Sequence, residues 1–189
     1  MARSRNFNLP NSITFARILI APVVFWLVLS AAPNDVAARF AACALFVVVL
    51  ASDGVDGAIA RKRGLITDLG KLLDPIADKL VTNGTLVCLS VLGELPWWVT
   101  GIIVLREVGI TLWRLVEARA GKVLPAAGGG KLKTVAQALA ISFALAPFPQ
   151  LLGEWFNWVN TALMAAAFTL TVSSGVSYLA AARAQRSAR

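Results

Sequence analysis

Residues 36–60, VAARFAACALFVVVLASDGVDGAIA, form an apolar segment that is long enough to cross a membrane as one helix. A hydrocarbon core of about 30 Å needs about 20 predominantly apolar helical residues. Five further segments have the same character, at 13–32, 75–93, 97–118, 133–152 and 157–181. Of the 189 residues, 58% are hydrophobic, and the mean hydropathy is +0.72. The sequence therefore predicts an all-α, polytopic integral membrane protein with six transmembrane helices, built as a single domain over residues 1–189.

Basic residues gather on one side of this predicted topology. They lie at the N-terminus (Arg3, Arg5), after the second segment (Arg61, Lys62, Arg63, Lys71), after the fourth (Arg119, Lys122, Lys131, Lys133) and in the C-terminal tail (Arg183, Arg186, Arg189). The alternate turns contain Asp35, Glu94 and Glu154, with Arg39 just inside the second helix. Because loops rich in Lys and Arg remain in the cytoplasm, we expect both termini of this multi-pass plasma-membrane protein to be cytoplasmic. This topology accounts for most of the net charge of +8 without a nucleic-acid partner, and a basic face favours anionic membrane lipid.

The N-terminal residues allow a second interpretation. Basic residues, an apolar run and then Ser30-Ala31-Ala32 resemble a secretory signal peptide. Arg17 within the run, and the five segments that follow, favour a first helix that is retained. We expect residues 1–12 to form an interfacial amphipathic segment and residues 183–189 to form a basic cytoplasmic tail.

The sequence contains no histidine and two cysteines, Cys43 and Cys88, each within an apolar segment. The lack of histidine excludes a Ser–His–Asp triad, a His-ligated zinc ion and a His general base. The position of the cysteines indicates packing instead of a disulfide framework. Acid–base chemistry is therefore left to carboxylates, lysines or Tyr178.

Four aspartates stand out against this apolar background: Asp53, Asp56, Asp74 and Asp78. The first two are three residues apart and the last two are four apart, so each pair shares one face of a helix. Asp74 followed by Pro75 looks like a helix N-cap with proline at the first helical position. Because the turn between the second and third segments is short, we expect antiparallel neighbours whose carboxylates meet at the cytoplasmic end.

Such a cluster needs compensating charge. One Asp at the centre of a membrane costs about 2.5–3.5 kcal/mol, so four would cost about 10–14 kcal/mol. Two divalent cations would balance the four charges, and ligands that are all oxygen favour Mg²⁺ or Mn²⁺. Two such ions can support an in-line displacement at phosphorus. Two alternatives remain open: the aspartates cap helices and pair with nearby Arg and Lys residues, or they line the ion pathway of an ion-coupled transporter.

The spacing of the aspartates also matches a known pattern, D-x2-D-G-x2-A-R-x8-G-x3-D-x3-D, at Asp53, Asp56, Gly57, Ala60, Arg61, Gly70, Asp74 and Asp78. On these residues the chain resembles the CDP-alcohol phosphotransferases, which transfer a substituted phosphate from a CDP-linked donor to an alcohol and release CMP. The resemblance implies that Asp53, Asp56, Asp74 and Asp78 hold two Mg²⁺ (or Mn²⁺) ions, with Asp78 also the general base. It implies that CDP-diacylglycerol is bound by Asn11, Thr14, Gly57, Ala60, Arg61, Thr67 and Gly70.

Three further blocks resemble the phosphatidylglycerophosphate synthases of that family: residues 8–17, Arg106-Glu107 with Arg114, and Gly130-Lys131-x-Lys133-Thr134-x2-Gln137. They imply an acceptor-phosphate site made of Arg106, Arg114, Lys131 and Lys133, and arginine suits phosphate through its fork of donors. Two other interpretations stay open. Lys131 and Lys133 are also a basic pair that the topology rule explains, and Arg106 is also a candidate for an internal ion pair with Glu107.

The sequence thus predicts transfer of the phosphatidyl group from CDP-diacylglycerol to glycerol-3-phosphate, at a site on the cytoplasmic side. The alternatives within the family are a phosphatidylinositol-phosphate synthase and a cardiolipin synthase. Small residues in the sixth segment, Ala165-Ala166-Ala167 and Ser173-Ser174-Gly175, permit close packing of helices and a homodimer.

Overall fold

The computed structural model describes residues 9–32, 34–63, 68–119 and 130–187, and gives the backbone alone at 9–11, 13, 53–63, 68–75, 78, 118–119, 130–131, 182 and 184–187. Throughout these ranges the regular structure is helical, as the sequence predicts. The helices are α1 (Leu9–Ser30), α2 (Val36–Arg63), α3 (Asp68–Val91), α4 (Trp97–Arg119), α5 (Gly130–Leu145), α6 (Phe148–Leu152) and α7 (Phe156–Ser187).

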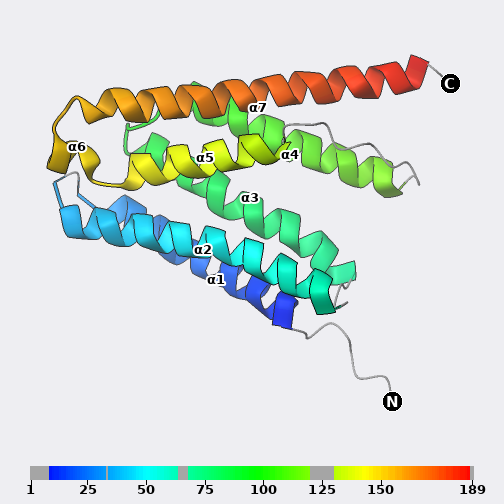
Figure 1. The fold of residues 1–189 in the computed structure, drawn as a ribbon, viewed down its shortest axis with the longest axis horizontal. Coiled ribbons are helices and arrows are strands. Elements are labelled where there is room, and N and C mark those ends of the chain that lie inside the picture. Colours follow the sequence, from blue (N-terminus) through cyan, green and yellow to red (C-terminus); the bar gives the residue numbers. More distant parts are fainter. Residues whose placement is uncertain (1–8, 33, 64–67, 120–129, 188–189) are drawn as a thin grey trace.

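The six long helices alternate in direction, which brings defined ends together. In Figure 1 the start of α1, the end of α2, the start of α3, the end of α4, the start of α5 and the end of α7 all lie at the right-hand end. The turn at 31–35, the turn at 92–96 and α6 lie at the opposite end. The end that carries the start of α1 and the end of α7 is called the signature end below, because Asp53, Asp56, Asp74 and Asp78 are in the second half of α2 and the first half of α3, toward this end.

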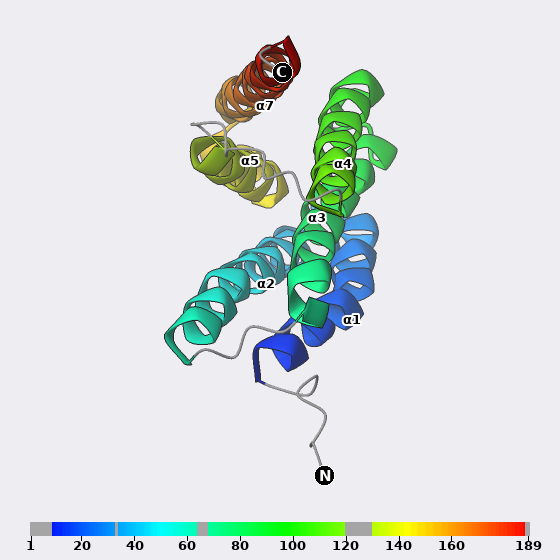
Figure 2. The same cartoon turned by 90° about the vertical axis from the view of Figure 1, so that its right-hand side faces the viewer.

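The helices close into a ring of neighbours. Helix α1 packs on α2 and α3, α5 packs on α2 and α7, and α4 packs on α3 and α7. Figure 2 shows this arrangement nearly end-on, with α5 and α7 on one side and α1, α2 and α3 grouped together. Helices α2 and α3 do contact each other, as expected, but each packs more extensively on α1.

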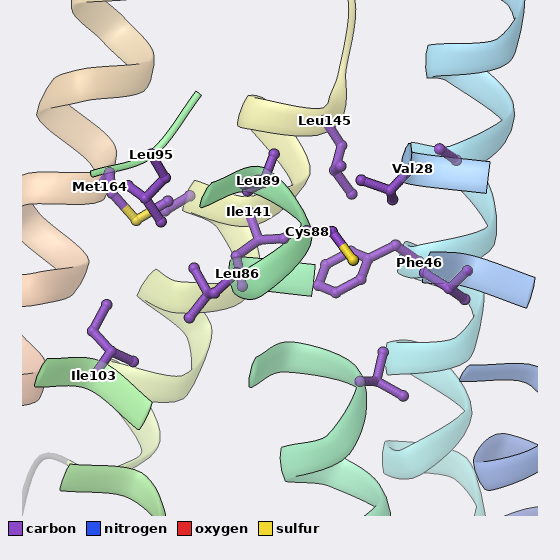
Figure 3. Close-up of a cluster of buried hydrophobic side chains, with 14 of the residues drawn as sticks. Val28, Phe46, Leu86, Cys88, Leu89, Leu95, Ile103, Ile141, Leu145 and Met164 are labelled. Carbon is purple, nitrogen blue, oxygen red and sulfur yellow. The ribbon is translucent and has the colours of Figure 1, made fainter. Parts of the chain in front are cut away.

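The core comes from all six long helices and lies mainly in the half of the bundle away from the signature end. Its largest fully buried apolar side chains are Phe46, Leu86, Leu89, Ile103 and Ile141 (Figure 3). Helix α1 contributes Val24 and Val28 to the same cluster, so it is an integral part of the packed bundle. Close packing of α1 on α3 depends on Gly84, where an added Cβ would lie 2.1 Å from Cζ of Phe25.

Two boundaries differ from the sequence prediction. Helix α3 begins at Asp68, so Asp74 and Pro75 lie inside it, and the N-cap interpretation was wrong. Pro75 removes one backbone hydrogen bond from the helix. Asp68 nevertheless suits the helix start, because an acidic residue near the N-terminus interacts favourably with the helix dipole. The fifth segment is also shorter than predicted: α5 ends at Leu145, and Ala146 and Pro147 separate it from the short α6.

Apolar side chains also point outward on every long helix, for example Leu19, Val48, Leu105 and Trp158. A helix that is apolar on all sides suits a lipid environment. By length and composition, one helical stretch in the described residues is long and apolar enough to cross a membrane, Phe156–Ala181 of α7. The other apolar helical stretches within the described residues, Thr14–Ser30, Val36–Ser52, Lys79–Val91 and Leu132–Leu145, are shorter.

Candidate active site

The residues of the aspartate motif lie on two helix segments toward the signature end. Asp53 and Asp56 are in the second half of α2, and Asp74 and Asp78 are in the first half of α3. Their side chains lie outside the described part of the structure, as do those of Asn11, Gly57, Ala60, Arg61 and Gly70, while Thr67 is outside it altogether. Thr14, on α1, is buried. The metal-binding, base and donor-binding roles of these residues therefore stay predictions.

Among the side chains that are described, no group of three or more His, Cys, Asp or Glu residues comes together as a metal site. The described charges near the signature end instead form a cationic cluster around Glu107. This side chain, on α4, is almost fully buried, with 2% of its area exposed.

Three cations from three helices contact the two carboxylate oxygens of Glu107. Lys133 of α5 donates from Nζ to Oε1 at 2.5 Å, and Arg106 of α4 donates from Nη1 to the same oxygen at 3.0 Å. Lys79 of α3 places Nζ 3.0 Å from Oε2. Among the described side chains, with Lys133, Arg106 and Lys79 charged, three positive charges face one negative charge.

Arg106 extends from α4 across to α7. Its Nη2 donates to Oγ of Ser174 at 2.6 Å, and its side chain lies directly against Gly175, where an added Cβ would be 3.1 Å from Cγ of Arg106. Its Nε is buried and has no hydrogen-bond partner among the described residues. The small residues of α7 therefore admit the side chain of Arg106 against the helix.

A buried hydrogen bond also joins α5, which carries Lys133, to α7, which carries Ser174. Nε2 of Gln137, one turn beyond Lys133 on α5, donates to Oγ1 of Thr171 on α7 at 2.8 Å. Because buried polar groups are costly without partners, this bond fixes α5 against α7 at the level of the cationic cluster.

The structure brings together some of the residues predicted for the acceptor phosphate and not others. Arg106 and Lys133 share Glu107 as a partner, and the predicted ion pair of Arg106 with Glu107 is present at the same time. Arg114 is exposed, eight residues and about 12 Å farther along α4. The side chain of Lys131 lies outside the described residues.

Sequence reasoning missed Lys79 and Ser174 as members of the cluster. A signal for Lys79 existed, because a glutamate inside an apolar segment needs cations from neighbouring helices, and Lys79 is the residue next to Asp78. No sequence pattern singled out Ser174, since its contact depends on which face of α7 turns toward α4.

The comparisons with known proteins define the class of the chain. The model of the CDP-alcohol phosphatidyltransferase family matches residues 7–173, and the chain belongs to that family of enzymes. Membership favours a divalent-metal-dependent transferase over the ion-coupled transporter considered above.

Individual relatives are similar over most of their length. The chain is 42% identical over 180 residues to the "Probable phosphatidylglycerophosphate synthase" of Mycobacterium tuberculosis, which covers 95% of this chain and 84% of the relative. It is 39% identical over 186 residues to the "CDP-diacylglycerol--glycerol-3-phosphate 3-phosphatidyltransferase" of Bacillus subtilis, covering 91% and 93%. A protein of the same name from Escherichia coli K12 is 34% identical over 186 residues, covering 94% and 96%.

Proposed function

We propose that this chain transfers the phosphatidyl group of CDP-diacylglycerol to the sn-1 hydroxyl of glycerol-3-phosphate, giving phosphatidylglycerophosphate and CMP. The names of the relatives support the reaction. The observation that carries the choice of acceptor is the cationic cluster of Lys79, Arg106 and Lys133 around Glu107, beside the position of Asp78 on α3.

The charge of the cluster suits a phosphate monoester. Such a group carries about −1.5 to −2 charges near pH 7 and presents three strong acceptor oxygens. Three cations gathered around one described carboxylate suit that charge and that acceptor character. Free alcohols such as serine or choline carry no group of this kind, so the cluster favours a phosphorylated acceptor.

The aspartate motif supplies the donor set for the metal ions. Four carboxylates on α2 and α3, in a chain without histidine, offer hard oxygen ligands that fit Mg²⁺ or Mn²⁺. Asp53, Asp56, Asp74 and Asp78 would hold two such ions, which when bound neutralise the pyrophosphate and the charge that develops at phosphorus.

Residues of the chain itself bind the two substrates and accept the proton. The cationic cluster holds the acceptor phosphate, which orients the acceptor and converts the reaction into an effectively intramolecular one. Asp78 accepts the proton of the sn-1 hydroxyl as its oxygen bonds to the phosphatidyl phosphorus. The bond from that phosphorus to the bridging oxygen breaks, and CMP leaves with this oxygen. Asn11, Thr14, Gly57, Ala60, Arg61, Thr67 and Gly70 hold CDP-diacylglycerol, and Arg114 and Lys131 attract the acceptor from the cytoplasm.

In this proposal six helices span the plasma membrane and the signature end faces the cytoplasm, together with both termini. The alternation of the helices and the outward apolar side chains support it. On the opposite side, the single cation Arg39 is neutralised by Glu94, at 2.5 Å, which agrees with a charge bias toward the cytoplasm. The homodimer stays a separate proposal, and in this chain Ser174 and Gly175 of the small-residue stripe are used internally.

An acceptor panel tests the reaction. Purified protein with Mg²⁺ and CDP-diacylglycerol should release CMP with glycerol-3-phosphate and not with inositol phosphate, serine or phosphatidylglycerol. Lys133→Gln should raise the KM for glycerol-3-phosphate about 10-fold to 100-fold, because a charged hydrogen bond is worth about 1.5–3 kcal/mol. Arg183→Gln, at an exposed position on α7, is the control. CMP release with inositol phosphate alone would show that the acceptor is wrong.

Asp78→Asn tests the base separately. It should abolish turnover while the unfolding temperature stays close to that of the unmodified chain. Near-full turnover in this variant would exclude Asp78 as the base and leave the acceptor assignment intact.

A further inference from the structure

A cavity of about 630 Å³ opens at the end of the bundle opposite the signature end. This size is within the range of about 300–1,000 Å³ that is usual for small-molecule sites. The cavity lies between the α3–α4 turn, the start of α4, the α5–α6 junction and the first half of α7. It shares no lining residue with the cationic cluster or the aspartate motif, so the proposed reaction does not use it.

The deep part of the cavity is apolar and elongated. Along α7 the lining residues run from Asn157 to Thr169, which is about 18 Å of helix. This distance is more than half of a hydrocarbon core of about 30 Å. Apolar side chains cover the wall, and Trp98 meets Phe168 edge-on with ring centroids 5.5 Å apart. The apolar lining residues are Leu89, Val99, Ala144, Met164, Ala165 and Phe168.

The mouth of the cavity is polar and rich in hydrogen-bond acceptors. It contains two carboxylates, Glu94 and Glu154, and one guanidinium, Arg39, so its formal charge is −1. Arg39 is already engaged, because its Nη2 binds both carboxylate oxygens of Glu94, at 2.6 and 2.5 Å. Nδ2 of Asn157 donates to Oε2 of Glu154 at 2.6 Å. Oδ1 of Asn160 is buried with no hydrogen-bond partner among the described residues.

An apolar channel of leaflet depth with an acceptor-rich mouth fits an amphiphile better than a soluble metabolite. Tryptophans at 97, 98, 155 and 158 surround this end of the bundle, and tryptophan concentrates at the membrane interface. The mouth would then be level with lipid head groups. Because it offers acceptors and a negative charge, it complements a head group that donates hydrogen bonds and repels an anionic one.

We propose that this cavity binds a membrane lipid of the leaflet that faces away from the active site, with an acyl chain along α7 and a hydrogen-bond-donating head group at Glu94, Glu154 and Asn160. The ammonium of phosphatidylethanolamine provides such donors. Phosphatidylcholine has the same net charge and no N–H group, so it serves as the matched comparison. The inference rests on the membrane orientation given in the proposed function and does not depend on the reaction.

Native mass spectrometry of the full chain, released from bilayers with equal amounts of the two lipids and identical acyl chains, tests this site. The protein should retain phosphatidylethanolamine about 3-fold or more over phosphatidylcholine, as one additional hydrogen bond allows. Ala165→Trp fills the cavity and should abolish retention, whereas Ala166→Trp, the next residue on α7 and outside the lining, should not. Asn160→Leu should remove the preference between the two lipids, while its unfolding temperature shows that the bundle remains folded.

Equal retention of the two lipids by the unmodified chain would overturn the proposal. A lipid-free dimer that is dissociated by Ala165→Trp would also overturn the proposal. In that case a second copy of the chain would fill the cavity. CMP release from each variant separates this site from the active site. We expect Ala165→Trp to lose lipid retention and to release CMP at the full rate. A chain that retains lipid but releases no CMP would contradict the proposed reaction and leave the lipid site intact.

Discussion

Nζ of Lys133 lies 2.5 Å from Oε1 of Glu107, and this contact joins α5 to α4 inside the bundle. Both side chains are nearly excluded from solvent, at 6% and 2% exposed. Since Glu107 also contacts Arg106 and Lys79, one carboxylate fixes the positions of cations from three helices. Among the described side chains three cations therefore share one carboxylate, whose main effect is to hold them close together.

Glu107→Gln tests this arrangement, because it keeps the size of the side chain and removes its charge. Three cations would then repel one another in a buried space, and breaking a buried ion pair costs about 3–5 kcal/mol. We expect a lower unfolding temperature and a higher KM for glycerol-3-phosphate, with the KM for CDP-diacylglycerol unchanged. Glu117→Gln is the control on the same helix, where the carboxylate accepts from Nε1 of Trp113 at 3.2 Å. If only stability changes, Glu107 has no part in positioning the acceptor.

Gly175→Ala tests the approach of Arg106 to α7. The new Cβ would lie 3.1 Å from Cγ and 3.2 Å from Nε of Arg106, so the guanidinium must move away from Ser174. We expect the KM for the acceptor to rise and kcat to change little. Gly109→Ala, which meets nothing within 4 Å, controls for the change of residue type. Identical kinetics in the two variants would mean that the exact position of Arg106 is unimportant.

Gly84→Ala tests the contact between α1 and α3. The added methyl group overlaps the ring of Phe25, and overpacking of this kind costs about 1–3 kcal/mol. Gly101→Ala has the same intrinsic preference for helix and meets nothing within 4 Å. Thermal unfolding in detergent should therefore occur at a lower temperature for Gly84→Ala than for Gly101→Ala. Equal unfolding temperatures would show that Phe25 moves aside without cost.

The pH dependence of stability tests the Arg39–Glu94 pair. Burial raises the pKa of Glu94 above the ordinary 4.5, and this effect outweighs the opposing attraction of Arg39. The folded chain therefore binds a proton at Glu94 more readily than the unfolded chain does, so this residue adds more to stability as the pH falls toward 4.5. Relative to Glu94→Gln, the unmodified chain should gain in unfolding temperature between pH 7 and pH 5.

A loss in unfolding temperature relative to Glu94→Gln between pH 7 and pH 5 would mean that the attraction of Arg39 affects the pKa of Glu94 more than burial does. The close geometry of the pair, at 2.5 Å, argues for that outcome, and the removal of the carboxylate from water argues against it. We favour burial, because Arg39 is itself largely removed from water and the pair must offset the desolvation of two ions.

The helices themselves were largely predictable from sequence, since apolar runs and turn residues are local signals. The starts of α2 and α4 were placed at the correct residues, 36 and 97. The start of α3 was misplaced because Asp74-Pro75 imitates a helix start, while the residues before it also favour a helix. The fifth helix was predicted to continue through Pro147 and Pro149 to residue 152, whereas α5 ends at Leu145.

The candidate site was predictable where a charge stands inside an apolar segment. The four aspartates stood out in this way, and their spacing then matched a known pattern. Arg106 and Lys133 were predicted from sequence blocks that resemble a known family, and they do share a partner. Lys79, Ser174 and the pairing of Arg39 with Glu94 were not found, because those contacts depend on how distant helices rotate toward one another.

The position of Lys79 has a consequence for the choice of acceptor. Asp78 and Lys79 are consecutive on α3, so their Cα atoms are about 3.8 Å apart. Because Lys79 contacts Glu107, a phosphate bound at the cationic cluster would lie close along α3 to Asp78, the proposed base. In the proposed reaction α3 would then favour acceptor alcohols with a particular number of carbons between phosphate and hydroxyl. Selectivity among phosphorylated alcohols would therefore depend on length as well as on charge.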